Sequence, residues 1–155
     1  MLAVPIFWRY VLVTLVSMVP IIELRGAIPI GVAWGLDTVP TYLLCVVGNM
    51  IPVPFILLFI RAVLKWMLRV PKLAPIAEWI HEKAAKNSKK VMKYATFGLF
   101  LFVAIPIPGT GAWTGALVAA LLDMRMKYAL PSIFLGVLTA GFIMTAGSSL
   151  VAMIF

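Results

Sequence analysis

The stretch Glu23-Leu24-Arg25-Gly26-Ala27-Ile28-Pro29-Ile30-Gly31 places an acid, a base, a proline and two glycines inside an otherwise apolar part of the chain. A second stretch, Ile105-Pro106-Ile107-Pro108-Gly109-Thr110-Gly111, interrupts the apolar sequence of the other half. Proline removes a backbone donor, and glycine permits backbone conformations that a continuing helix does not use. Each stretch therefore predicts a break between two helical arms.

The composition around these breaks is that of a membrane protein. The chain has 155 residues, of which 64% are hydrophobic and only 12% are charged. A soluble domain of this length has too much surface to cover with so few polar residues. One His and one Cys, scattered acids and no zinc-ligand cluster, phosphate-binding loop or nucleophile elbow argue against an enzyme. We therefore expect a non-enzymatic membrane protein without a metal or cofactor.

Most of the net charge of +8 lies in one connector, residues 61–94, which carries nine Lys and Arg residues and two acids. Lys and Arg resist translocation, so a basic connector between apolar halves predicts the cytoplasmic side of a cell (inner) membrane and not nucleic-acid binding. Apolar residues recur in it at helical spacing, with Trp66 and Trp79 suited to the headgroup zone. Two interpretations stay open: an amphipathic helix on the anionic inner leaflet, or a solvated charged face.

The two halves, residues 1–60 and 95–155, repeat one pattern within a single membrane domain over 1–155. Each half has an apolar arm, a break, a short apolar arm, an acid (Asp37 or Asp123) and a full span. The predicted spans are Val39 to Ile60 and Tyr128 to Phe155. The arms are too short to cross alone, since 13 or so helical residues cover roughly 20 Å of a core of about 30 Å.

Each pair of arms is therefore either a kinked span or a re-entrant hairpin. Lysines before Ala95 and the bases Arg125 and Lys127 put both ends of the second pair on the cytoplasmic side, which favours a hairpin. For the first pair, Arg9 favours a kinked span and the repeat favours a hairpin entering from outside. The predicted fold is all-α: two inverted repeats, each a re-entrant hairpin plus a transmembrane helix, joined by a basic amphipathic cytoplasmic helix.

Glu23 and Arg25 are ionisable residues beside a predicted break, and such residues are costly at membrane depth. Two residues apart, they do not face each other on a regular helix, but they can in an unwound turn. One interpretation is an ion pair that fastens the hairpin. The other is a functional site, in which Arg25 holds an anionic head and Glu23 carries a proton.

The glycines at the breaks add backbone N–H groups where helices restart, and such helix starts bind anions. The alternative is close helix packing through small residues such as Gly111 and Gly115. The predicted substrate and proton site comprises Glu23, Arg25, Gly26, Pro29, Pro106, Pro108, Gly109, Thr110 and Gly111.

The two motifs resemble those of the small multidrug export protein family, which is similar to the wider DedA, or VTT-domain, group. That resemblance implies two inverted re-entrant hairpins and transport of undecaprenyl phosphate or phospholipid that depends on the proton gradient. Glu23 resembles the acid of the DedA first hairpin, and Pro108-Gly109 resembles the Pro-Gly of the second. The arginines that flank that Pro-Gly in DedA proteins are missing, because Ile105 and Gly111 stand at about those places.

We therefore expect a transporter of an amphiphilic, lipid-phosphate substrate, coupled to protons through Glu23. Two alternatives stay open: efflux of small cationic amphiphilic drugs, and a non-transporting membrane organiser that gathers anionic lipid. The expected partners are membrane lipids, the amphiphilic substrate and protons. A homodimer is expected as well, because so short a chain has few complete spans with which to enclose a pathway.

Overall fold

The computed structural model describes residues 5–85 and 89–154, and helices connected by turns make up this part of the chain, with no strand. The all-helical prediction is confirmed. The helices are α1 (Ile6–Met18), α2 (Glu23–Ala33), α3 (Thr38–Met50), α4 (Pro52–Met67), α5 (Ala74–Ala85), α6 (Lys89–Ala104), α7 (Ala112–Leu121) and α8 (Met126–Ile154).

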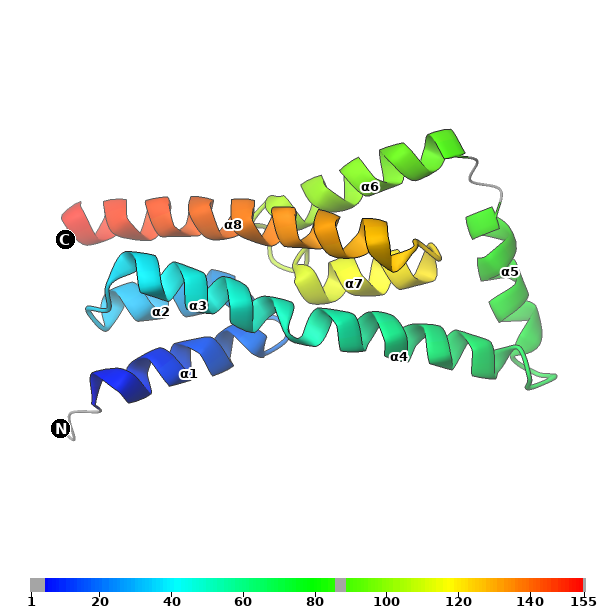
Figure 1. Cartoon of the computed structure of the whole chain (residues 1–155), viewed down its shortest axis with the longest axis horizontal. Coiled ribbons are helices and arrows are strands. Elements are labelled where there is room, and N and C mark those ends of the chain that lie inside the picture. The colour runs from blue at the N-terminus through cyan, green and yellow to red at the C-terminus, as the bar shows by residue number, and fades with distance from the viewer. Residues whose placement is uncertain (1–4, 86–88, 155) are drawn as a thin grey trace.

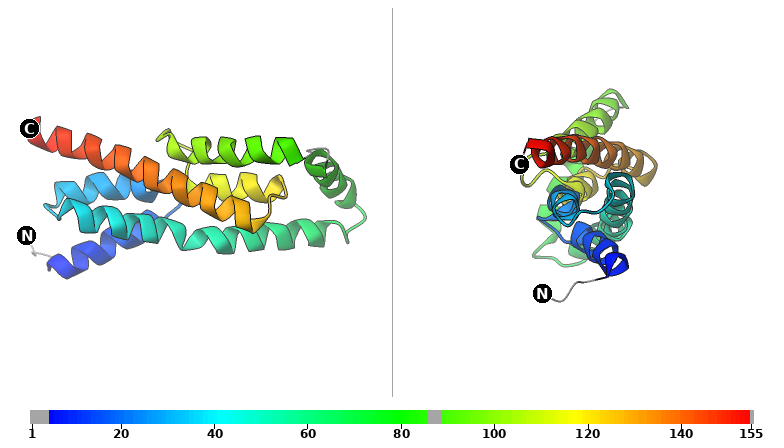
Figure 2. Two further views of the ribbon diagram at one scale, coloured as in Figure 1. Left: turned by 45° about the horizontal axis from the view of Figure 1, so that its top comes forward. Right: turned by 90° about the vertical axis from the view of Figure 1, so that its left-hand side faces the viewer.

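Two helical hairpins enter the molecule from opposite ends (Figure 1). Helix α1 runs from one end to the middle, α2 returns, and α3 with α4 then runs the whole length. At the far end α5 crosses over, α6 runs to the middle, α7 returns toward α5, and α8 then runs from the α7–α8 turn to the opposite end of the molecule. The described N- and C-terminal ends lie at the same end of the molecule, away from α5 (Figure 2). The α1–α2 and α6–α7 turns both lie near mid-length (Figure 1).

Two apolar helical segments are long enough to cross a membrane. They are Thr38–Met67, with 30 residues, and Met126–Ile154, with 29 residues. At 1.5 Å per residue each covers about 44 Å, against a hydrocarbon core of about 30 Å. Only 39% and 17% of their most apolar windows are buried, so most of this surface faces outward, unlike a core helix of a soluble protein. The predicted span Val39 to Ile60 falls within the first segment, and the predicted span Tyr128 to Phe155 lies in the second as far as Ile154, since Phe155 is outside the described residues.

The first break is not where the proline and glycine pattern predicted it. Helix α2 already begins at Glu23 and continues through Pro29, so the prediction of a break within Glu23–Gly31 is wrong. The chain reverses one turn earlier, at Val19–Ile22, where Ile21 has a φ of +80°. Helix α2 tolerates Pro29 because four neighbouring residues are buried, namely Leu24, Ala27, Ile28 and Gly31, and that packing offsets one lost helical bond.

The second break lies where it was predicted, between Ala104 at the end of α6 and Ala112 at the start of α7. The first long span contains an additional interruption at Ile51, directly before Pro52 and Pro54. Ile51 keeps a right-handed helical conformation, so α4 continues roughly along α3. We call residues 48–54 the α3–α4 junction.

The connector is not one helix, contrary to the prediction. Arg61 and Lys65 belong to α4, α5 is a separate helix, and α6 begins at Lys89. Arg61 donates a hydrogen bond to the carbonyl of Met124, which ties α4 to the α7–α8 turn. Among the described side chains, those of Trp66 and Trp79 are exposed. The predicted amphipathic pattern also rests on residues whose side chains lie outside the description: Lys83, Ala84, Lys86, Asn87, Lys89, Lys90, Val91 and Lys93.

Small residues let the helices of the core approach closely. Val103 of α6 lies against Gly115 of α7 and Gly136 of α8, where an added Cβ would come within 2.6 and 2.7 Å of its side chain. Alanines fill much of the remaining core, including Ala27, Ala112, Ala116, Ala119, Ala120, Ala129 and Ala140. Close packing through small side chains is typical of helices associating in membranes.

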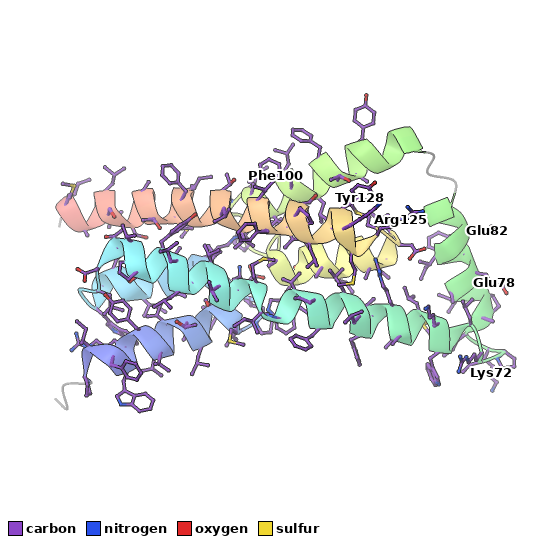
Figure 3. All side chains as sticks on the ribbon, in the orientation of Figure 1. Lys72, Glu78, Glu82, Phe100, Arg125 and Tyr128 are labelled. Carbon is purple, nitrogen blue, oxygen red and sulfur yellow. The ribbon has the colours of Figure 1, made fainter. Side chains whose placement is uncertain are left out.

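We expect the α5 end of the molecule to face the cytoplasm, because the basic residues gather there, as do the labelled Lys72 and Arg125 in Figure 3. In a Cys45→Ala background, Glu78→Cys and Met126→Cys should react with an impermeant thiol reagent from the same membrane face. Thr38→Cys, at the opposite end, should react from the other face. Labelling of Glu78→Cys and Met126→Cys from different faces would contradict this topology.

Candidate functional site

The two hairpins are joined at mid-length by the side chain of Glu23. Its Oε1 accepts a hydrogen bond from the backbone N–H of Trp113 at 3.1 Å, and its Oε2 accepts one from the N–H of Ala112 at 3.3 Å. Ala112 and Trp113 begin α7, so the carboxylate lies at the positive end of that helix. Glu23 is only 4% exposed, and these bonds stabilise a charge that burial alone would make costly.

Two local features bring the carboxylate to α7. Glu23 adopts a φ of +49° directly after the strained turn at Ile21, which swings the start of α2 toward the second hairpin. Positive φ is uncommon for residues other than glycine and is a genuine outlier for the β-branched Ile21. On the other side, Gly111 has no side chain, and a Cβ there would overlap the Glu23 carboxylate. Gly111 is therefore required for the close approach.

Arg25 binds the opposite side of the same break. Its Nη1 donates to the carbonyl of Ile107 at 2.5 Å. Its Nη2 lies within donor distance of the carbonyls of Val103, Ile105 and Thr110, at 2.8 to 3.1 Å. These carbonyls belong to the end of α6 and to the turn that follows, where helical donors have run out. The guanidinium therefore stabilises the negative end of α6 as Glu23 stabilises the positive end of α7.

A third side chain ties the hairpins together in the reverse direction. The indole Nε1 of Trp113 donates to the carbonyl of Met18, the last residue of α1, at 3.1 Å. We call Glu23, Arg25, Gly111 and Trp113, with the backbone groups that they bind, the inter-hairpin clasp. Sequence reasoning did not assign this role to Trp113. The available signal was an indole donor two residues after Gly111, next to a predicted break.

The clasp differs from the ion pair between Glu23 and Arg25 that one sequence interpretation predicted. Instead of bonding to one another, the two side chains bond to different parts of the second break. The start of α7, expected to attract a substrate anion, is occupied by the Glu23 carboxylate. The Arg25 donors expected to hold such an anion are engaged by backbone carbonyls.

The other predicted site residues lie around the clasp. Gly26 and Pro29 are inside α2 and bring no hydrogen-bonding side chain to it. Pro106, Pro108 and Gly109 form the α6–α7 turn, where Gly109 has a φ of +89°. Thr110 supports that turn by donating through Oγ1 toward the carbonyls of Ile105 and Ile107. Within the described ranges, no cluster of three or more His, Cys, Asp or Glu residues could hold a metal ion.

The fold and the clasp together define a small helical membrane protein with two spanning segments and two shorter, joined hairpins. Residues 23–143 match the family described as "Putative small multi-drug export protein", and the chain belongs to this family. The matched region begins at Glu23, directly after the first break, and includes the second break and the α3–α4 junction. No curated protein and no solved structure matches the chain. The likeness to the DedA group remains a prediction.

Replacing Gly111 by Ala should lower the free energy of unfolding by about 1 to 3 kcal/mol, the usual cost of overpacking. The added methyl group has to displace the Glu23 carboxylate from α7. A matched control is Gly98→Ala in α6, where no atom lies within 4 Å of the added Cβ. The control should be neutral or stabilising by up to about 1 kcal/mol. Thermal unfolding in detergent compares the two, and equal melting temperatures would contradict the role of Gly111.

Replacing Arg25 by Gln should destabilise the protein by about 2 to 3 kcal/mol, because several carbonyls at the second break lose a charged donor. Arg69→Gln is the control, since Arg69 is an exposed residue beyond the end of α4. Its substitution should change the melting temperature little. A small effect of Arg25→Gln, no larger than that of the control, would mean that the clasp contributes little to stability.

Proposed function

We propose that this protein exports small cationic amphiphilic molecules across the cell membrane, with the two joined hairpins forming the centre of its pathway. The clasp carries this proposal, because it brings two broken hairpins from opposite ends together at mid-length. The description of the family, small multi-drug export, supports the same class of function. Broken helices that meet near the middle of a membrane are typical of transporters.

In this proposal the hairpins are re-entrant and the two halves are inverted repeats. Helices α1, α2 and α7 have 13, 11 and 10 residues, so at most roughly 20 Å each is available to cross about 30 Å of hydrocarbon. The basic α5 end lies in the cytoplasm, and the α1–α2 hairpin enters from outside. Each hairpin is followed by one of the two long segments, which crosses the membrane completely.

The occupancy of the clasp supports a cationic rather than an anionic substrate. A lipid phosphate would have to draw Arg25 away from several carbonyls, and it would meet the Glu23 carboxylate at the start of α7. A cationic head faces neither obstacle. Lipid-phosphate transport stays a second candidate, favoured by the position of Arg25 as a cation at mid-length and by the resemblance to DedA proteins.

Glu23 is the natural point of proton coupling. Its bonds to α7 depend on a carboxylate that accepts from two backbone N–H groups. Adding a proton removes the charge that favours the positive end of α7, so the contact between the hairpins weakens. Deprotonation restores it. The pathway would then open alternately to the two sides of the membrane as the clasp closes and loosens.

A homodimer would cover the turns of both hairpins. Ile21 is 96% exposed and Ile107 is 53% exposed, although both lie in non-helical backbone near mid-length. Such backbone is tolerated at membrane depth only where protein covers it or where it lines a wet cavity. A second copy packed over the turns supplies that cover and closes the pathway on the lipid side.

Transport can be tested in liposomes with ethidium as the fluorescent cation. The wild type should move ethidium at a rate that depends on an imposed pH difference, whereas Glu23→Gln should lose the pH dependence because residue 23 no longer titrates. Protein-free liposomes control for leakage. Retained pH dependence in Glu23→Gln would contradict proton coupling through this residue.

The same liposomes separate the alternatives. Fluorescent phospholipid and polyprenyl phosphate should not be moved faster than in protein-free liposomes. If they are moved and ethidium is not, the lipid-phosphate candidate replaces the present proposal. A non-transporting organiser would move neither probe, tolerate changes at Glu23 and Arg25, and fail when the connector lysines are removed.

A further inference from the structure

Asn49, in the last turn of α3, is a buried amide without a satisfied acceptor. Its side chain is 1% exposed, and its Oδ1 has no hydrogen-bond partner. Leaving a buried polar group unpaired costs about 1 to 3 kcal/mol, so each such group calls for an explanation. A hydrophobic residue of similar size would avoid this cost, and so would a bound group that donates to the Oδ1 or is coordinated by it.

The backbone around Asn49 adds further acceptors. Pro52 and Pro54 have no N–H, so the carbonyls of Gly48 and Met50, four residues earlier, lack their helical donors. The α3–α4 junction thus combines the Asn49 Oδ1 with two undercommitted backbone oxygens within one helical turn. Oxygen acceptors without donors attract a cation and repel an anion.

The junction lies beside the first hairpin, near the clasp. A Cβ added at Gly48 would overlap Ser17 and Thr14, so the junction packs directly against the last turns of α1. Along the long axis it lies near mid-length, level with the α1–α2 turn (Figure 1). One turn before Asn49 on α3, Val46 approaches Gly141 of α8. The junction therefore packs against α1 through Gly48, whereas Ile51 within it is 43% exposed.

We propose that the α3–α4 junction binds a monovalent cation, with the Asn49 Oδ1 as its side-chain ligand. The inference deepens the proposed export function and rests on it. The cation is the charged head of the exported molecule or a co-transported sodium ion, and the two share the same recognition by neutral oxygens. Backbone carbonyls that prolines have deprived of their helical donors suit such an ion. A neutral amide, unlike a carboxylate, holds it weakly enough for release.

The charged residues at mid-length leave this role open. Glu23 is committed to α7, and Arg25 is committed to the end of α6. The cation therefore meets a neutral site. Because Gly48 of the junction contacts α1, a cation bound at the junction can influence the position of α1.

Binding of ethidium and of ²²Na⁺ to the purified protein tests the site without requiring transport. Asn49→Leu should weaken binding of the occupying cation at least about tenfold, with an unchanged or raised melting temperature, since an unsatisfied amide is removed. Asn49→Asp should tighten it, because a carboxylate attracts the cation more strongly. Thr41→Val is the matched control, since Thr41 also has a buried, unpartnered Oγ1 on α3, and it should bind as the wild type does.

Wild-type affinity for both probes in Asn49→Leu would overturn the site. If the wild type binds neither probe, the junction holds at most a buried water, and the site is overturned as well. Should Asn49→Leu fail to fold, unchanged affinity in Asn49→Asp overturns it instead. If ethidium binds and sodium does not displace it, the occupant of the site is the charged head of the substrate. If ²²Na⁺ binds saturably, the occupant is a co-transported sodium ion. Cation binding that depends on Asn49 without any ethidium transport would leave the site standing and remove the export function.

Discussion

The interaction on which the structure depends is the bond between the Glu23 carboxylate and the start of α7. A helix that begins at membrane depth exposes backbone N–H groups where no water can satisfy them. Helix α7 begins near mid-length of the molecule, directly after the second break. A buried carboxylate from the other hairpin supplies acceptors and a complementary charge at once, and the same bonds remove the cost of burying the carboxylate.

Each hairpin thereby supplies hydrogen-bond partners for backbone groups of the other that lie where its helices end or begin. Arg25 donates hydrogen bonds to carbonyls at the end of α6, and Trp113 donates one to the last carbonyl of α1. Neither hairpin alone has partners for these groups, so the two halves are interdependent even though they enter from opposite ends. The strained backbone at Ile21 and Glu23 is held in place by the bonds that it makes possible.

The sequence predicted the long spans, the second break and the importance of Glu23 and Arg25, because apolar runs and a local charged motif carry these features. It did not predict the partners of that motif, which lie 78 to 90 residues away. It also misplaced the first break, since Pro29 is a stronger local signal than the Val19–Ile22 turn, and burial of α2 overrides it. The sequence did not predict a role for Asn49, because one amide in an apolar run forms no pattern. Pro52 and Pro54 were the only sequence signal near it.

These contacts imply different roles for the charged and the neutral groups at mid-length. Full charges at mid-depth are costly, so the protein commits both Glu23 and Arg25 to backbone groups that need them. Transport requires groups that exchange partners readily, and strongly engaged charges do so slowly unless a proton alters them. The neutral Asn49 Oδ1 at the α3–α4 junction has no partner to lose, which makes it better suited to transient binding. The hydrogen bonds of Glu23 then set the spacing of the hairpins around that site without taking part in the binding itself.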